Sequence, residues 1–480
     1  MMRKWIYILV CVCAMVGCHE YQPSEDPSLQ LSFSCDTLSF DTVFSEQGSA
    51  TLRLMVYNRN AQALVIDRIW QDDGTVFRVN IDGEADLSRL TNLPIYGGDS
   101  LFVFVRISQT DAFASNAAVY ISDHLHFHTQ NGNTHSVTLE AFAQDVTRLG
   151  KKGGRVELDS YTFSAKQPYL LYDTVIIIGD LTIDAGATLY MHNGACIYAL
   201  GDVTAAGTLE HPITIRSDRL DRLFDSVPYL YAGGGWNGVY LQAEEPHTYQ
   251  FDYVDILSGN VGLYAYSTCT DALPQLHMNG CRIHNHTLYG LVLVNTDAQV
   301  ANTEISNCAS YCVYCGGGKH NFVHSTIASY FNYTSIRIQS VAKDNAAAVF
   351  IDNMQKTGPQ TVTSFYNSII TGFLSNQLVV ATPFDQYYPG TFVGNYLKTD
   401  TLMMPHATNN VYWQKEDTAN VFRNNFYEYK KYVYYDFRLD SLSPALGIGD
   451  SIVALPYPTD RLGVSRAGTK PDAGCYQSEK

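Results

Sequence analysis

Charged side chains are scarce in this sequence, and basic ones are in the minority. Only 16% of the 480 residues are charged, with 31 Lys and Arg against 47 Asp and Glu, for a formal net charge of −16. A protein that binds nucleic acid needs a basic surface, so this balance excludes nucleic acid as a partner. It also argues against anionic polysaccharides unless a cation bridges the two, although solubility alone is a sufficient reason for an acidic chain.

Long charged stretches of helix-forming residues are also missing. In their place the sequence has 35 Gly, 16 Pro and 34 Tyr. Aromatic rings pack well across half-buried strands, so this composition favours β-structure. A length of 480 residues exceeds one ordinary compact core, which predicts two domains or an elongated repeat.

Beyond the N-terminus, no stretch is long and apolar enough to span a bilayer, which takes roughly 20 apolar residues. At the N-terminus, two basic residues precede an apolar run from Trp5 to Val16, the arrangement of an export signal. The run ends in Met15-Val16-Gly17-Cys18, which resembles a lipobox. We therefore expect a signal peptide over residues 1–18, lipid attachment at Cys18 and a tether over residues 19–29. The alternative is an ordinary secretory signal in which Cys18 has no role.

Cysteine is too sparse in the folded part for a disulfide scaffold. Three of the 11 cysteines lie in the N-terminal segment, and we expect most of the other eight to be buried small hydrophobes. One group, Cys308-x3-Cys312-x2-Cys315-x4-His320, has the donor set of a tetrahedral zinc site. Because part of this group lies in a strand-like run of an exported chain, we expect no metal here. A disulfide within the group is the alternative.

Residues 30–146 contain seven short apolar or alternating runs separated by turn-forming clusters such as Asp72-Asp73-Gly74. Seven such strands in this length predict a β-sandwich. Their order, from Leu38-Ser39-Phe40 to a late Gly97-Gly98-Asp99, resembles immunoglobulin-like domains of the abnormal-spindle type. That resemblance implies a spacer or binding module. The basic, Gly-rich stretch that follows predicts a linker over residues 147–158.

Beyond residue 158 the sequence repeats short strands and Gly turns. Ile283, Ile305 and Ile327 lie 22 residues apart in similar phrases. A fixed period near 20 residues with strand chemistry is typical of a solenoid whose turns bury apolar side chains against each other. The Leu-x-x-Leu-x-Leu spacing of a leucine-rich horseshoe is absent. We therefore expect an all-β chain, with an N-terminal immunoglobulin-like β-sandwich followed by a right-handed parallel β-helix over residues 159–480.

Several phrases in this region carry a family resemblance. They include Gly186-Ala187-Thr188-Leu189-Tyr190, Gly235-Trp236-Asn237-Gly238-Val239 and Pro471-Asp472-Ala473-Gly474-Cys475-Tyr476. On these phrases the chain resembles uncharacterised pectin-lyase-like β-helix lipoproteins of Gram-negative bacteria. Its C-terminus resembles the choice-of-anchor type segment that closes many surface β-helices. The resemblance implies an exported protein anchored in the bacterial envelope, with the outer membrane as its expected location, and it implies no activity.

Polysaccharide lyases and hydrolases of this fold use clustered or paired acids, in lyases together with Ca²⁺ and a basic residue. We find no Asp-Asp pair in the repeats. The 22-residue step does place Arg282 beside Glu304, and His284 in the next row. If the chain is an enzyme, these three residues are the catalytic candidates. The alternative is an exposed set of satisfied charges, worth less than about 1 kcal/mol.

An insertion over residues 218–236 holds Tyr229, Tyr231 and Trp236 beside three glycines. Exposed aromatic rings next to a solenoid groove can stack on sugar rings, so these three are the candidate ligand-binding residues. Packing of the same rings in the core is the alternative.

The sequence as a whole predicts a membrane-anchored exported lipoprotein with a non-catalytic β-helix surface that binds carbohydrate. A divergent polysaccharide lyase or hydrolase is the first alternative, and an envelope protein that binds another protein is the second. We expect no cofactor and no metal, with Ca²⁺ as the exception if the protein is a lyase.

Overall fold

The computed structural model describes residues 23–45, 49–107, 119–220, 222–224, 227–331, 347–352, 359–381, 390–399, 407–414, 420–426, 433–467 and 470–478. The chain divides into two compact units, residues 1–145 and 146–480. Nearly all regular structure is β, so the expected all-β class is confirmed. Among the described residues, no helix has the length and apolar character needed to cross a membrane.

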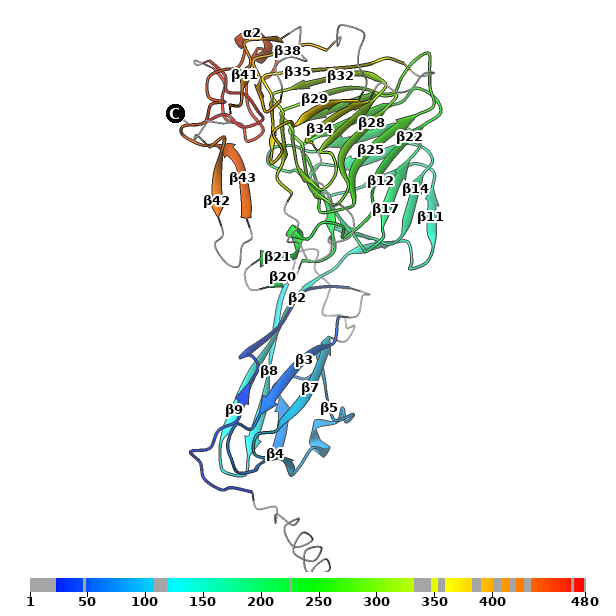
Figure 1. Ribbon diagram of the computed structural model, residues 1–480. Coiled ribbons are helices and arrows are strands. Elements are labelled where there is room, and N and C mark those ends of the chain that lie inside the picture. Colours follow the sequence, from blue (N-terminus) through cyan, green and yellow to red (C-terminus); the bar gives the residue numbers. More distant parts are fainter. Residues whose placement is uncertain are drawn as a thin grey trace, which may run out of the picture. The chain divides into compact units, whose positions relative to one another are not determined.

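The first unit is a β-sandwich of two sheets (Figure 1). The five-stranded sheet has the order β2 (Thr37–Phe44), β9 (Thr134–Gln144), β8 (Val119–Thr129), β4 (Leu64–Gln71) and β6 (Leu93–Ile95). The four-stranded sheet has the order β1 (Ser32–Phe33), β3 (Leu52–Tyr57), β7 (Ser100–Ile107) and β5 (Phe77–Ile81). A short 3-10 helix, η1 (Leu87–Arg89), follows β5.

Strand β7 shows which side chains of the four-stranded sheet face the core and which face outward. Leu101, Val103, Val105 and Ile107 are buried in the core. Because successive side chains of a strand point to opposite faces, the residues between them, Phe102, Phe104 and Arg106, point outward. The outer face of the four-stranded sheet therefore carries large aromatic and basic side chains.

The second unit is a parallel β-helix built from three long sheets, with one strand of each sheet in each regular turn (Figure 1). Sheet A consists of β10 (Thr147–Leu149), β13 (Tyr169–Leu171), β16 (Thr188–Met191), β19 (Ile213–Ser217), β24 (Val254–Leu257), β27 (Arg282–His286), β30 (Glu304–Cys308), β33 (Thr326–Ser329), β36 (Ile369–Gly372), β39 (Tyr396–Leu397) and β41 (Val411–Tyr412). Sheet B consists of β11 (Arg155–Leu158), β14 (Thr174–Ile177), β17 (Cys196–Ala199), β22 (Gly238–Ala243), β25 (Val261–Ser267), β28 (Tyr289–Val294), β31 (Val313–Gly316), β34 (Val349–Asp352) and β37 (Leu378–Val380). Sheet C consists of β12 (Tyr161–Phe163), β15 (Leu181–Asp184), β18 (Val203–Ala206), β23 (Thr248–Asp252), β26 (Gln275–Asn279), β29 (Asp297–Ala301), β32 (Gly318–Val323), β35 (Thr361–Tyr366), β38 (Phe392–Val393) and β40 (Ala407–Thr408).

The 22-residue period corresponds to one turn of this β-helix. Ile283 pairs with Ile305, and Ile305 with Ile327, on neighbouring strands of sheet A. All three side chains are fully buried in one continuous apolar core that runs from Phe163 to Leu397. Each turn therefore covers the apolar interior of the next, as the repeat predicted.

The predicted linker over residues 147–158 is wrong for most of its length. Strands β10 and β11 lie in this stretch and pair in parallel with β13 and β14, so they form the first turn of the β-helix. Leu149 and Leu158 pack against its core. The Gly-rich residues between the two strands form the turn, in which Gly150 and Gly153 have positive φ. The flexible composition reflects this turn and not a separation between domains.

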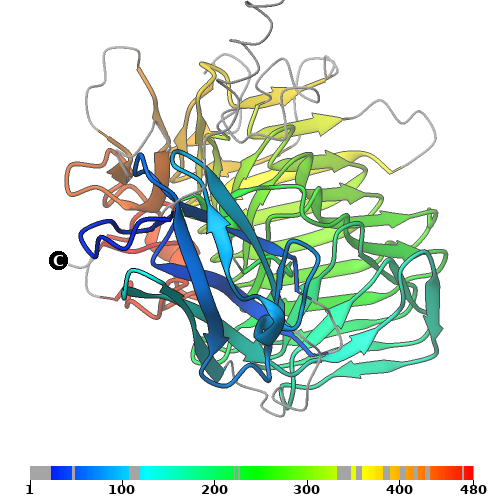
Figure 2. The same ribbon diagram turned by 90° about the horizontal axis from the view of Figure 1, so that it is seen from below.

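The C-terminal part of the chain contains both extra turns and a side structure. Strands β38 to β41 continue sheets A and C, whereas β42 (Phe422–Phe426) and β43 (Val433–Leu439) form a separate antiparallel hairpin. Residues 440–478, which we call the closing segment, contain the short helix α2 (Ser451–Ala454). In Figures 1 and 2 the orange and red end of the chain lies along one flank of the strand stack.

Candidate functional site

The three candidate catalytic residues do come together on the outer face of sheet A. Arg282 pairs with Glu304 across β27 and β30, and His284 pairs with Ser306. The Ser306 hydroxyl donates to Glu304 Oε1 at 2.6 Å, and His284 Nδ1 lies 2.8 Å from Ser306 Oγ. His284 Nδ1 and Glu304 Oε1 are 3.7 Å apart. The register therefore assembles a compact polar cluster.

The closing segment covers most of this cluster, although the Arg282 side chain remains 32% exposed. Glu304 is only 4% exposed, and the Tyr476 hydroxyl donates a hydrogen bond to its Oε2. Arg461 contacts the carboxylate of Asp255, which also accepts a hydrogen bond from Arg282 at 3.0 Å. A second small core, which includes Ile369, Phe437 and Tyr476, lies between the closing segment and sheet A. The Glu304 carboxylate is therefore shielded from solvent.

The protonation states of the cluster also argue against acid–base chemistry. Burial lowers the pKa of His284 to about 4. Burial by itself would raise the pKa of Glu304, but His284, Arg282 and the donor hydroxyls of Ser306 and Tyr476 together hold that pKa below its usual value. Near neutral pH the imidazole is therefore neutral and the carboxylate ionised. Neither group has the pKa near the operating pH that a general acid or base needs, so we interpret the cluster as a structural dock.

The sequence contains Asn295-Thr296-Asp297, a tripeptide of the polygalacturonase kind. In this structure its Asp297 accepts hydrogen bonds from the neighbouring turns. The backbone N–H of Lys319 donates to Asp297 Oδ1 at 2.7 Å, and the Gln275 amide donates to Oδ2 at 3.3 Å. These neighbours occupy the adjacent turns, and neither is an acid. In this structure Asp297 therefore joins two neighbouring turns of sheet C.

The candidate ligand-binding aromatics pack against the body of the β-helix. Trp236 is fully buried, and its indole Nε1–H donates to the Leu257 carbonyl at 2.9 Å. Tyr229 is buried in a short 3-10 helix, η3 (Tyr229–Tyr231), with the Arg219 guanidinium carbon 3.9 Å from its ring centroid. Tyr231 is partly exposed. Strands β20 (Arg222–Phe224) and β21 (Val227–Pro228) form a small hairpin just before η3. Because Trp236 has no face open to solvent, the prediction that it binds ligand is wrong.

The cysteine and histidine side chains of the zinc-like spacing are divided among the three sheets. Cys308 lies on sheet A, Cys315 on sheet B and His320 on sheet C, and all are buried in the interior. His320 Nδ1 is 2.9 Å from the Thr363 hydroxyl. Within the described ranges, no group of three or more metal-binding side chains converges, and the eight cysteines there are free thiols.

The outer face of sheet B carries an aromatic row that sequence reasoning missed. Parallel pairing aligns Tyr198, Tyr240 and Tyr264 on successive strands, and it aligns Tyr314 with Phe350 further along. Two more rings border the row. We call this set the aromatic stripe; its members are Tyr198, Tyr240, Tyr264, Tyr289, Tyr311, Tyr314 and Phe350, and all are partly exposed.

The rings of the stripe stack on one another along the axis of the β-helix. The ring centroids of Tyr198 and Tyr240 are 4.8 Å apart with an interplanar angle of 14°, and those of Tyr240 and Tyr264 are 5.9 Å apart. Phe350 stacks on Tyr314 at 5.8 Å. Val292 stands between the two halves. With neighbouring strands about 4.8 Å apart, the five steps from Tyr198 to Phe350 span about 24 Å.

The hydroxyl groups of Tyr240 and Tyr314 stay protonated near neutral pH. Burial, together with the neighbouring tyrosines, raises the pKa of Tyr240 to about 12. Burial and the hydrogen bond to Asp352 also raise the pKa of Tyr314, whose hydroxyl donates to Asp352 Oδ2 at 2.7 Å. The stripe thus combines flat apolar faces with neutral hydrogen-bonding tips.

Comparison with known proteins adds no relative of known function. No family model and no curated protein matches the chain. Solved structures with some likeness include the ASH or PapD-like domain of human CEP192, at 10% identity over 27% of this chain and 96% of that chain, with a TM-score of 0.19. Others are the VesB protease of Vibrio cholerae, at 12% identity over 24% and 32% of the chains with a TM-score of 0.17, and the major pilin subunit of Bacillus cereus, at 10% identity over 27% and 44% with a TM-score of 0.14. Likenesses at these TM-scores carry no argument about function.

Proposed function

We propose that the protein is an exported lipoprotein whose β-helix binds a neutral polysaccharide along the aromatic stripe. The observation that carries the proposal is the row of partly exposed rings on sheet B, which runs from Tyr198 to Phe350 in two halves separated by Val292. Aromatic rings stack on the apolar C–H faces of sugars, and tyrosine hydroxyls add hydrogen bonds at the edge. A glycan that lies along the axis would contact several rings at once.

Two features favour a neutral glycan over an acidic one. The whole chain carries a formal net charge of −16, which repels polyanions at long range. At the stripe itself, the charged group in contact is the Asp352 carboxylate, which accepts the hydrogen bond from Tyr314. A uronate chain on the stripe would bring further negative charge to this carboxylate, whereas a neutral chain avoids that repulsion.

The anchor is proposed on sequence alone. Cys18 lies outside the described residues, and the support for it is the apolar run that ends in the lipobox-like Met15-Val16-Gly17-Cys18. We propose a pectin-lyase-like lipoprotein of the bacterial outer membrane, with acyl chains on Cys18. Radiolabelled palmitate should be incorporated into the wild-type chain and not into Cys18→Ala. Label retained in Cys18→Ala would overturn the anchor.

The glycan proposal is tested with the unlipidated chain, residues 19–480, by affinity electrophoresis in gels that contain neutral polysaccharides. We expect one or more neutral glycans to retard the protein, and the double variant Tyr240→Ala/Tyr264→Ala to lose most of the retardation. Each ring that stacks is worth about 1 kcal/mol, so the pair should weaken binding at least tenfold. The matched control is Phe373→Ala, because Phe373 is 49% exposed on the same β-helix but lies outside the stripe.

The same samples are assayed for reducing ends and for unsaturated uronates, with Ca²⁺ present. Binding without products supports a non-catalytic glycan receptor. Product release would identify a lyase or hydrolase and overturn the non-catalytic proposal. Absence of retardation by every glycan, or equal retardation of the double variant, would overturn the stripe as the binding surface and favour a protein partner.

A further inference from the structure

The outer face of the four-stranded sheet in the first unit carries an unusual group of side chains. Phe102 and Phe104 of β7 are 43% and 41% exposed, and their rings stack with centroids 6.4 Å apart. Arg53 of β3 places its guanidinium 5.6 Å from the Phe102 ring centroid. Exposed aromatic side chains that lie together beside a cationic one form a candidate binding surface.

Two arginines face each other across the neighbouring strand pair. Arg78 of β5 and Arg106 of β7 are direct partners in the antiparallel register. Like charges directly opposite each other destabilise a sheet. Within the described part of the chain, neither arginine side chain forms an ion pair. Between them they make a single hydrogen bond there, which Arg78 Nη1 donates to the Gly74 carbonyl at 2.9 Å. An anion held between the two guanidinium groups would remove this repulsion.

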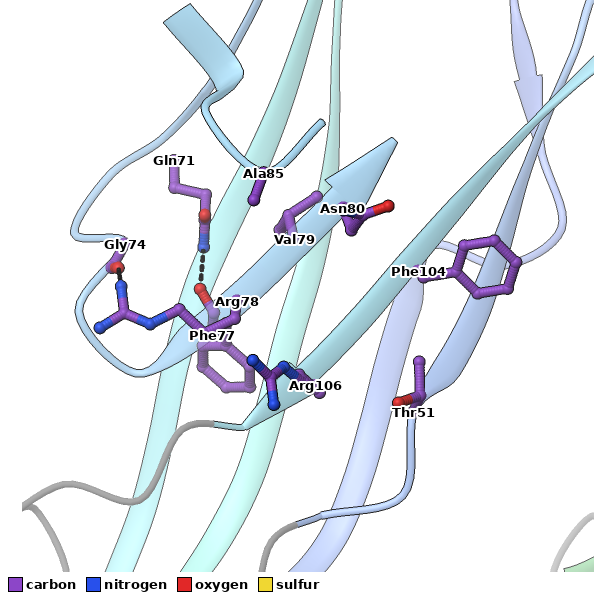
Figure 3. Close-up of a pocket in the computed structure, with 10 residues that line it drawn as sticks. All are labelled: Thr51, Gln71, Gly74, Phe77, Arg78, Val79, Asn80, Ala85, Phe104 and Arg106. Atoms are coloured by element: carbon purple, nitrogen blue, oxygen red, sulfur yellow. Dashed lines mark hydrogen bonds between the residues drawn. The ribbon is translucent and has the colours of Figure 1, made fainter. Parts of the chain in front are cut away.

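These arginines line a cavity of about 270 Å³ (Figure 3). Phe104 stands at one side of it, and Asn80 of β5 lines it beside the arginines. The side-chain oxygen of Asn80, Oδ1, accepts a hydrogen bond from the backbone N–H of Gly83, which leaves the side-chain NH₂ group of Asn80 as a donor. The cavity therefore offers two cationic forks, one neutral donor and one aromatic face.

We propose that this cavity binds a single carboxylated sugar, such as a uronic acid residue of a glycan. A guanidinium fork matches the two oxygens of a carboxylate, and the Phe104 ring offers a flat surface to the pyranose. The cavity has room for one sugar ring and not for a chain. Because the whole protein is acidic, an isolated uronate among neutral sugars suits it better than a polyuronate. This site is separate from the aromatic stripe, so each proposal can fail alone.

The test is calorimetric titration of residues 19–480 with methyl glucuronide, its uncharged amide and methyl glucoside. We expect binding of the glucuronide only, and a loss of at least tenfold in affinity in each of Arg78→Gln and Arg106→Gln. Arg59→Gln is the matched control, because this exposed arginine lies over the Tyr57 ring and does not line the cavity. Tyr240→Ala should leave glucuronide binding unchanged. Melting temperatures within two degrees of wild type, roughly the spread expected for surface substitutions, establish that each variant is folded.

Three results would overturn the proposal. Equal affinity for the glucoside and the glucuronide would show that the carboxylate is not recognised. Unchanged affinity in Arg78→Gln and Arg106→Gln would place binding elsewhere. Binding to phosphatidylglycerol vesicles that both variants abolish, without sugar binding, would identify the patch as a membrane contact.

Discussion

The Tyr476 hydroxyl donates a hydrogen bond to the Glu304 carboxylate, although 172 residues separate the two in the sequence. The contact joins the closing segment to the middle of the β-helix. It helps to bury the Glu304 carboxylate, which belongs to a polar cluster with the composition of an enzyme site.

Tyr476→Phe should destabilise the β-helix by about 1–3 kcal/mol, because it leaves a buried carboxylate oxygen without its donor. Urea unfolding monitored by circular dichroism measures the change. Tyr266→Phe is the control, since Tyr266 lies on the same β-helix, is 39% exposed and should tolerate the loss of its hydroxyl. Equal midpoints for Tyr476→Phe and wild type would show that the hydrogen bond does not hold the segment.

Gly474→Ala should be strongly destabilising, by about 3 kcal/mol or more, because φ is +95° and a Cβ would lie 2.7 Å from Thr326 Oγ1. Gly447→Ala is a matched control with φ of +63° and open space around the added Cβ. It should lose only about 1 kcal/mol from the backbone conformation. If both variants melt at the same temperature, close packing of the closing segment on sheet A is wrong.

Stability should fall as the pH drops from about 6.5 towards 4. Burial lowers the pKa of His284 and of His320 to about 4 and that of His286 to about 3, from an ordinary value of 6.5. In this window the unfolded chain binds protons that the folded chain does not, so acid favours unfolding. Glu304, whose pKa is lowered, adds a further loss below its ordinary value of 4.5.

Urea midpoints at pH 7.5, 6.5, 5.5 and 4.5 measure this dependence. His320→Gln should reduce the slope, because it removes one of the buried imidazoles whose pKa is lowered, a set that also includes His324. His211→Gln should leave the slope unchanged, since His211 lies on an exposed turn. A flat profile between pH 7.5 and 4.5 would contradict the burial of these rings.

Trp236→Phe should reduce stability by about 2–4 kcal/mol while leaving glycan retardation unchanged. The substitution removes the hydrogen bond to the Leu257 carbonyl and opens space in the core. Thermal melting and affinity electrophoresis on the same preparation separate the two effects. Loss of retardation in a variant that melts like wild type would restore Trp236 as a ligand-binding residue.

The sequence was most informative where turns have equal length. The 22-residue step between Ile283 and Ile327 predicted the solenoid and the meeting of Arg282 with Glu304. The same step could not show that the closing segment lies over this cluster, because Tyr476 and Arg461 come from a distant segment that does not repeat. Burial of the cluster is a tertiary property that the local pattern does not encode.

The aromatic stripe escaped prediction for a different reason. Directly paired members of the stripe are 24 to 42 residues apart in the chain, because insertions lengthen individual turns. Strand pairing aligns the rings in space, although their spacing in the sequence follows no fixed period. The Arg78–Arg106 pair was hidden in the same way, since register between antiparallel strands depends on the loops that join them.

The closing segment has a consequence for how the β-helix unfolds. A stack of turns held only by nearest-neighbour contacts can fray from either end, one turn at a time. Arg461, Tyr476 and Cys475 instead contact β24, β30 and β33 in succession. Opening one turn in this span requires the closing segment to break its contacts with the other turns as well. We therefore expect these turns to unfold together as one cooperative block. We therefore expect resistance to stepwise unfolding to be greatest in the middle of the stack.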